Sequence, residues 1–142
     1  MTATSWQLWA GLSATFAALT AIFAKVGVEG VNSVFATFYR TIVVAIALAV
    51  LLLATGQFEL PKLATGKTYL FLTLSGFATG ASWLCYFRAL KIGNAAQVAP
   101  VDKLSVVLVA IFAALFLGEK LTSVNWAGVA MIGIGAVLVA LR

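Results

Sequence analysis

Three charged side chains, Arg40, Asp102 and Lys103, lie within apolar runs that are long enough to cross a bilayer. A charge at the bilayer centre costs about 2.5–3.5 kcal/mol or more, so such residues usually mark a substrate pathway or a proton relay. Arg40 and Asp102 each lie about six residues into their runs, which at about 1.5 Å per residue is about 9 Å below the helix start. Their matching depth predicts an ion pair.

The residues beside Asp102 add two expectations. Lys103 is rotated by about 100° from Asp102 and should lie on another face of the helix, where it extends to the membrane surface or lines the same vestibule. Pro100 lacks the N–H that would bind the Ala96 carbonyl, so we expect a kink there. Two interpretations stay open. The charges line a polar vestibule in which Asp102 titrates, or they lie at the interface and anchor helix ends.

Aromatic residues form a second set of candidates. Trp83, Tyr86 and Tyr39 are predicted to line a wall for an apolar or cationic ligand. Trp and Tyr also gather at membrane interfaces for reasons unrelated to ligands, and Trp9 fits that explanation better.

The composition places the chain among integral membrane proteins. Of its 142 residues, 63% are hydrophobic and 9% are charged, with a mean hydropathy of +1.11. Soluble domains carry about a quarter charged residues. The net charge of +5 suits lipid headgroups rather than nucleic acid, because the cations are dispersed between apolar runs.

Cys85 is the single cysteine and histidine is absent. With no nucleophile–base set, no paired carboxylates and no phosphate-binding glycine loop, we expect no enzyme, cofactor or metal site.

The elements that must position these residues are apolar runs joined by short polar loops. Runs of this length form helices, because in lipid the backbone must satisfy its own hydrogen bonds. We therefore predict an all-α integral membrane protein, a five-helix bundle forming one domain over residues 1–142. The predicted spans cover residues 6–24, 34–54, 68–89, 96–118 and 124–141.

Small residues recur in the third and fifth spans. Such residues let helix backbones approach closely. A helix-packing role is therefore predicted for Gly76, Gly80, Gly128, Gly133 and Gly135.

Several segments together resemble one known family. They are Ser82–Leu90 (SWLCYFRAL), Ala95–Pro100 (AAQVAP), Leu117–Lys120 (LGEK), Trp126–Gly128 (WAG) and Gly133–Gly135 (GIG). Their order and spacing are similar to those of one EamA domain, the five-helix unit of the drug/metabolite transporter superfamily. The resemblance covers nearly the whole chain. Most members contain two such units, so this chain resembles the single-unit bacterial and archaeal branch.

The resemblance implies a secondary transporter that exports or exchanges a small organic metabolite or drug. It also implies a multi-pass protein of the inner (cytoplasmic) membrane and a homodimer, parallel or antiparallel, since one unit lacks its second repeat. The related four-helix small multidrug resistance family uses an acid in its first helix. The first span here has none, so that coupling chemistry does not carry over. The alternative is a non-transporting membrane subunit of a larger complex or a lipid-handling system.

Loop charges test the orientation. The face opposite the N-terminus carries Lys25, Arg88, Lys91 and Arg142, and the N-terminal face carries Lys62, Lys67 and Lys120. This near-balance gives a weak positive-inside bias and suits dual topology. Counting Arg40 and Lys103 with the first group favours that face as cytoplasmic.

Overall fold

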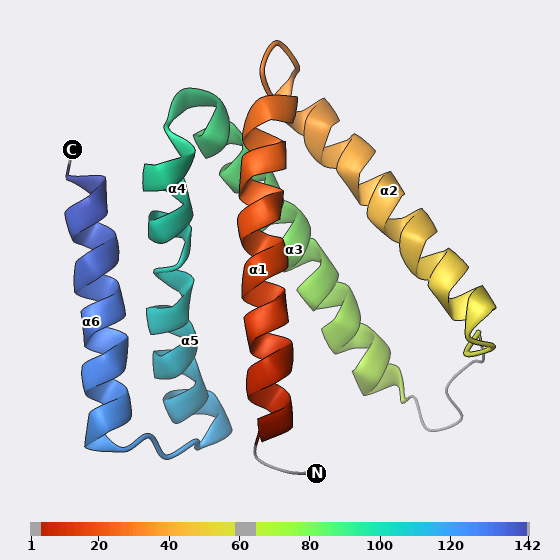
Figure 1. The fold of residues 1–142 in the computed structure, drawn as a ribbon. Helices are drawn as coiled ribbons and strands as arrows, with labels where there is room; N and C mark the ends of the chain where they lie inside the picture. The colour runs from red at the N-terminus through yellow and green to blue at the C-terminus, as the bar shows by residue number, and fades with distance from the viewer. Residues whose placement is uncertain (1–3, 59–64, 142) are drawn as a thin grey trace. The chain divides into compact units, whose positions relative to one another are not determined.

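The computed structural model describes residues 4–58 and 65–141. These residues form helices and contain no strand, which confirms the predicted all-α fold (Figure 1). The loop residues Glu59, Pro61 and Lys62 lie outside the described part. In chain order the elements are α1 (Thr4–Gly27), α2 (Ser33–Ala54), α3 (Gly66–Ile92), α4 (Ala95–Asp102), α5 (Ser105–Phe112), η1 (Ala113–Leu117) and α6 (Ser123–Ala140).

Five helical segments are long and apolar enough to cross a membrane. They contain 18 to 27 residues, and at about 1.5 Å per residue even the shortest is about 27 Å long, close to the hydrocarbon thickness. Elements α4, α5 and η1 together make the fourth of these segments, Ala95–Leu117. The prediction of five spans is confirmed, and the chain is a multi-pass membrane protein.

The fourth span is interrupted twice. Element α4 ends at Asp102, and the amides of Val106 and Val107 then bind the carbonyls of Lys103 and Leu104, both at 3.0 Å. These bonds reach back three residues instead of four, so the backbone tightens there. The interruption begins three residues after Pro100, whose ring cannot continue the regular ladder.

The end of the fourth span is a wide turn. The π-helix η1 stops at Gly118, which has a φ of 68°, a left-handed conformation that glycine adopts without steric cost. The Glu119 amide then binds the Ala113 carbonyl at 3.1 Å, which satisfies one of the free carbonyls at the helix end. Glu119 therefore lies at a helix cap.

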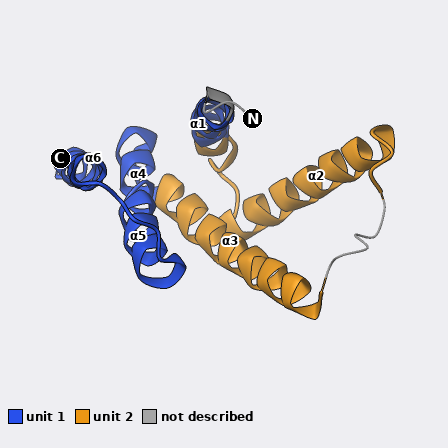
Figure 2. Ribbon diagram, turned by 90° about the horizontal axis from the view of Figure 1, so that it is seen from below, with its two compact units in different colours: residues 1–23, 92–142 blue, residues 24–91 orange. Residues whose placement is uncertain are grey.

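The described chain divides into two compact units, residues 1–23 with 92–142 and residues 24–91 (Figure 2). In the first unit, α6 packs against α4 and α5. A Cβ at Gly133 of α6 would lie 3.2 Å from Cγ2 of Val107 on α5. The missing side chain of Gly133 thus permits this close approach.

The second unit contains the end of α1 followed by α2 and α3. Helices α2 and α3 approach each other where α2 begins and α3 ends, and they diverge toward the connection between them (Figures 1 and 2). Buried side chains gather at the convergent end. They are Ala24, Val28, Ser33, Thr37, Phe87 and Leu90.

Most of the remaining apolar surface is open. In each of the five segments at most 6% of the most apolar window is buried. An apolar surface of this extent requires lipid or another protein surface around it.

Candidate functional site

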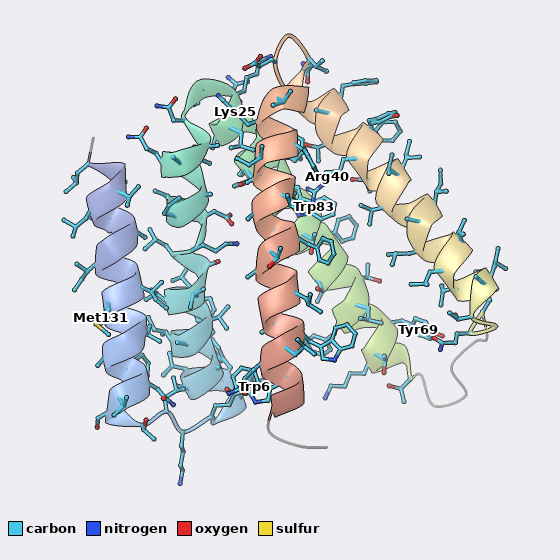
Figure 3. The ribbon with its side chains drawn as sticks, in the orientation of Figure 1. Trp6, Lys25, Arg40, Tyr69, Trp83 and Met131 are labelled. Atoms are coloured by element: carbon cyan, nitrogen blue, oxygen red, sulfur yellow. The ribbon has the colours of Figure 1, made fainter. Side chains whose placement is uncertain are left out.

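Arg40 contacts two aromatic rings at the convergent end of the second unit. Its guanidinium carbon lies 4.1 Å from the centroid of the Trp83 ring and 5.6 Å from that of Phe87. The side chains of Arg40 on α2 and Trp83 on α3 point toward each other (Figure 3). Both distances lie within the range of cation–π attraction. We call Arg40, Trp83 and Phe87 the arginine–aromatic cluster.

The sequence of α3 explains why two rings reach one guanidinium. Trp83 and Phe87 are four residues apart, so they lie on the same face of the helix. Phe87 is buried and Trp83 is half-buried, which fixes this face toward α2. Phe87 was missed by the sequence analysis, although its i, i+4 spacing from Trp83 was a signal that could have found it.

The start of α2 determines the depth of Arg40. The Asn32 side chain caps this helix and accepts a hydrogen bond from the Val34 amide at 2.8 Å. Helix α2 therefore begins at Ser33, and Arg40 lies seven residues further on, about 10 Å along the axis. The guanidinium is thus placed inside the second span.

Two lysines join the elements around the cluster. The Lys25 ammonium donates to the Leu90 carbonyl, and the Lys91 ammonium donates to the Val31 carbonyl, both at 2.8 Å. Leu90 lies in the last turn of α3, where carbonyls have no partner within the helix. These bonds connect the end of α1, the following loop and the end of α3. From the sequence, both lysines are predicted only as loop charges, so these two bonds are a finding of the structure.

The other predicted aromatics lie differently. Tyr39 is 63% exposed. Tyr86 is half-buried and lies on α3, between Trp83 and Phe87 in the sequence. Their predicted lining role stays a prediction.

Asp102 and Lys103 form an ion pair with each other. The Lys103 ammonium lies 3.4 Å from a carboxylate oxygen of Asp102, and both side chains are exposed to a third or more. The expectation that Lys103 lies on another face of the helix stays a prediction, because this contact joins two neighbours in sequence at the end of α4, where Lys103 is the cap. The long lysine side chain can therefore reach back. Such exposed pairs contribute about 0–1 kcal/mol.

The predicted ion pair between Arg40 and Asp102 stays a prediction, because these residues belong to different units. Asp102 forms its ion pair with Lys103. The described ranges contain no group of three or more metal-ligating side chains.

The five predicted packing glycines differ in their surroundings. Only the Cβ position at Gly133 meets a neighbouring side chain. A Cβ at Gly76, Gly80, Gly128 or Gly135 would meet no atom of the described chain within 4 Å. A packing role at these four positions stays a prediction.

Comparison with known proteins gives two matches. The profile of the EamA-like transporter family matches residues 4–141. A protein of Sinorhizobium sp, described as an uncharacterized transporter in the cobO 3' region, is 64% identical over 136 residues, which cover 96% of each chain. No solved structure matches. A match over almost the whole length, together with five membrane-spanning segments, shows that the chain belongs to the EamA-like transporter family.

Proposed function

We propose that this protein is a secondary transporter that exports or exchanges a small organic metabolite or drug across the cytoplasmic membrane. It acts as a homodimer in which Arg40 and Asp102 line a polar vestibule. The observation that carries the proposal is the arginine–aromatic cluster, which holds a charge inside a membrane span. Family membership supports the transport role.

The cluster combines properties that a binding site needs. Trp83 and Phe87 supply apolar surface, and Arg40 supplies a directional charge. Recognition sites for small molecules usually combine an apolar wall with a few polar groups. A purely structural arginine would be expected to pair with a carboxylate, whereas Arg40 in the described structure interacts with aromatic side chains.

Asp102 is proposed as the titrating group. It ends α4 at the interruption of the fourth span and is partly exposed. Transporters commonly bind substrates and coupling ions where a membrane helix is broken. Protonation of Asp102 would weaken its pairing with Lys103, which gives proton binding a structural consequence.

The homodimer is supported by the single-unit organisation. The Sinorhizobium protein aligns over 96% of its own length, so it has the same size. The open apolar faces of the helices provide surface for a second copy.

The test is flux through vesicles that contain only this purified chain. A panel of metabolites is offered with and without a pH gradient, and at least one is expected to be transported. Asp102→Asn should abolish the dependence of flux on the gradient, whereas Glu119→Gln, at the cap after η1, should preserve it. Unchanged gradient dependence in Asp102→Asn would remove this residue from the mechanism. Flux that requires a different protein would favour the alternative role of a non-transporting subunit.

A further inference from the structure

We infer that the arginine–aromatic cluster binds an oxyanion, a carboxylate or a phosphate, carried by a ligand with an apolar body. This inference deepens the proposed function, on which it rests, by naming the chemical class of the substrate. All the residues on which this inference rests lie within the unit of residues 24–91.

The first step concerns the hydrogen-bond donors of Arg40. A guanidinium carries five N–H donors, and the indole of Trp83 is itself a donor, while Phe87 has no polar atom. The two ring contacts therefore supply no lone pair to these N–H groups. Arg40 also interacts electrostatically with Tyr86, whose hydroxyl oxygen has two lone pairs and can accept from at most two of the five donors. The remaining donors receive no acceptor from these side chains.

The second step concerns the surroundings. Unsatisfied donors at membrane depth are costly, because neither lipid tails nor aromatic rings replace water as acceptors. Thr37 and Thr41 lie on the same helix, and their hydroxyls donate to the Ser33 and Thr37 carbonyls at 2.8 Å. Each hydroxyl keeps lone pairs that could accept a hydrogen bond, but in the described structure neither accepts one from Arg40. The donors of Arg40 are therefore open to an acceptor from outside these elements.

The third step concerns the sign of the charge. Beside Arg40, the convergent end of the second unit carries Lys91 at the end of α3, and the acid Glu29 lies in the exposed loop after α1. Lys91 donates to the Val31 carbonyl, which is a neutral acceptor, so this bond does not cancel the positive charge of Lys91. A positive field of this kind attracts anions.

The fourth step concerns selectivity. The arginine fork matches the two oxygens of a carboxylate or phosphate and binds them through paired hydrogen bonds. The neighbouring rings then contact the apolar body of the ligand. A cationic ligand has the same sign of charge as Arg40 and would be repelled by it, so its binding is disfavoured.

The experiment uses the full chain in nanodiscs, with Trp6, Trp9 and Trp126 replaced by Phe so that Trp83 is the remaining tryptophan. Four probes share a cyclohexyl body that does not absorb near 280 nm: cyclohexanecarboxylate, cyclohexylphosphonate, cyclohexanecarboxamide and cyclohexylammonium. Calorimetry measures affinity, and Trp83 emission reports whether binding occurs at the cluster. We expect the two anions to bind and to change the emission, and the amide and the ammonium to bind at least about tenfold more weakly, because a hydrogen bond between charged groups is lost.

Three variants separate the role of Arg40 from folding. Arg40→Gln should weaken anion binding at least about tenfold, and Arg40→Lys should weaken it less because the charge remains while the fork is lost. Arg88→Gln is the matched control, an exposed arginine on α3, and should change the affinity less than about twofold. Equal anion affinity in Arg40→Gln and the parent protein, or equal binding of the amide and the carboxylate, would overturn the inference.

Two further arms identify the source of the oxyanion and separate this inference from the proposed function. If adding phosphatidylglycerol to phosphatidylcholine nanodiscs leaves the carboxylate affinity unchanged, the oxyanion comes from a solute. If it lowers that affinity, the site holds a lipid headgroup. Anion binding without any flux in vesicles supports the site and contradicts the transport proposal. Flux that is indifferent to Arg40→Gln supports transport and contradicts the site.

Discussion

At the scale of single residues, the contact between Arg40 and Trp83 explains how a charge is held inside a span. A cation–π contact contributes about 0.5–1 kcal/mol when exposed and about 2 kcal/mol or more when desolvated. The distance of 4.1 Å from the guanidinium carbon of Arg40 to the centroid of the Trp83 ring therefore predicts a measurable coupling between the two side chains.

A double-mutant cycle of Arg40→Gln and Trp83→Leu tests this coupling. We expect a coupling free energy of unfolding in mixed micelles of about 0.5–2 kcal/mol, because each single substitution already removes the cation–π contact. The control cycle pairs Arg40→Gln with Phe77→Leu, a residue of α3 that is 74% exposed. Its coupling should be near zero. Equal coupling in both cycles would contradict the contact.

Lys25 offers a second prediction at this scale. Lys25→Met removes the bond to the Leu90 carbonyl and leaves that acceptor in a buried position, so we expect a loss of about 1–3 kcal/mol in the free energy of unfolding. Lys120→Met, in the exposed segment before α6, should change it by less than about 0.5 kcal/mol. Thermal unfolding in detergent measures the stability of both variants. Similar losses in Lys25→Met and Lys120→Met would contradict a stabilising role for the bond from Lys25 to the Leu90 carbonyl.

Sequence reasoning found part of the cluster. Arg40 and Trp83 could be singled out because a charge and a large aromatic in apolar runs are each unusual. Their contact could not be derived, because it depends on the rotation of α2 relative to α3, which hydropathy does not specify. Regular helix geometry predicts different faces for Lys103 and Asp102. Their contact where α4 ends depends on the rotamer of the lysine side chain, which the sequence does not specify.

At the scale of elements, length and hydropathy were sufficient to predict five spans, since the bilayer imposes the length of a helix. The two interruptions of the fourth span were harder to predict from the sequence. Pro100 indicated that the fourth span is irregular, but neither the tightened turn after Asp102 nor the π-helix η1 could be derived from hydropathy or length.

The contact of α5 with α6 gives the third prediction. Gly133→Leu should lower the free energy of unfolding by about 1–3 kcal/mol, because its side chain would overlap Val107, which lies 3.2 Å from the Cβ position. Val107→Ala should restore part of the loss. Gly135→Leu is the matched control, because its Cβ position is open. A loss at Gly133 that Val107→Ala does not relieve would contradict this packing.

At the scale of the whole molecule, the proposed homodimer predicts self-association in lipid through the small residues that permit close helix contact. We expect two copies per particle when labelled protein is counted by photobleaching in dilute vesicles. Gly76→Leu and Gly80→Leu should reduce the dimer fraction without lowering the melting temperature, because both positions are open within the chain and small residues permit close helix contact. Gly11→Leu on α1 is the control. A monomer at all densities would exclude the homodimer.

The orientation of the chain is a separate prediction at the same scale. The balanced loop charges should allow both orientations, which reporters for the two compartments at each terminus would reveal. A single orientation would restrict the dimer to the parallel arrangement.

The most direct test of the account is uptake of an organic anion by vesicles that contain only this chain. Uptake is compared at increasing substrate concentration for the unmodified protein, Arg40→Gln and Arg88→Gln. We expect half-saturation to rise at least about tenfold in Arg40→Gln and to stay within about twofold in Arg88→Gln. The same half-saturation in all three proteins would contradict the claim that Arg40 on its aromatic surface binds the transported ligand.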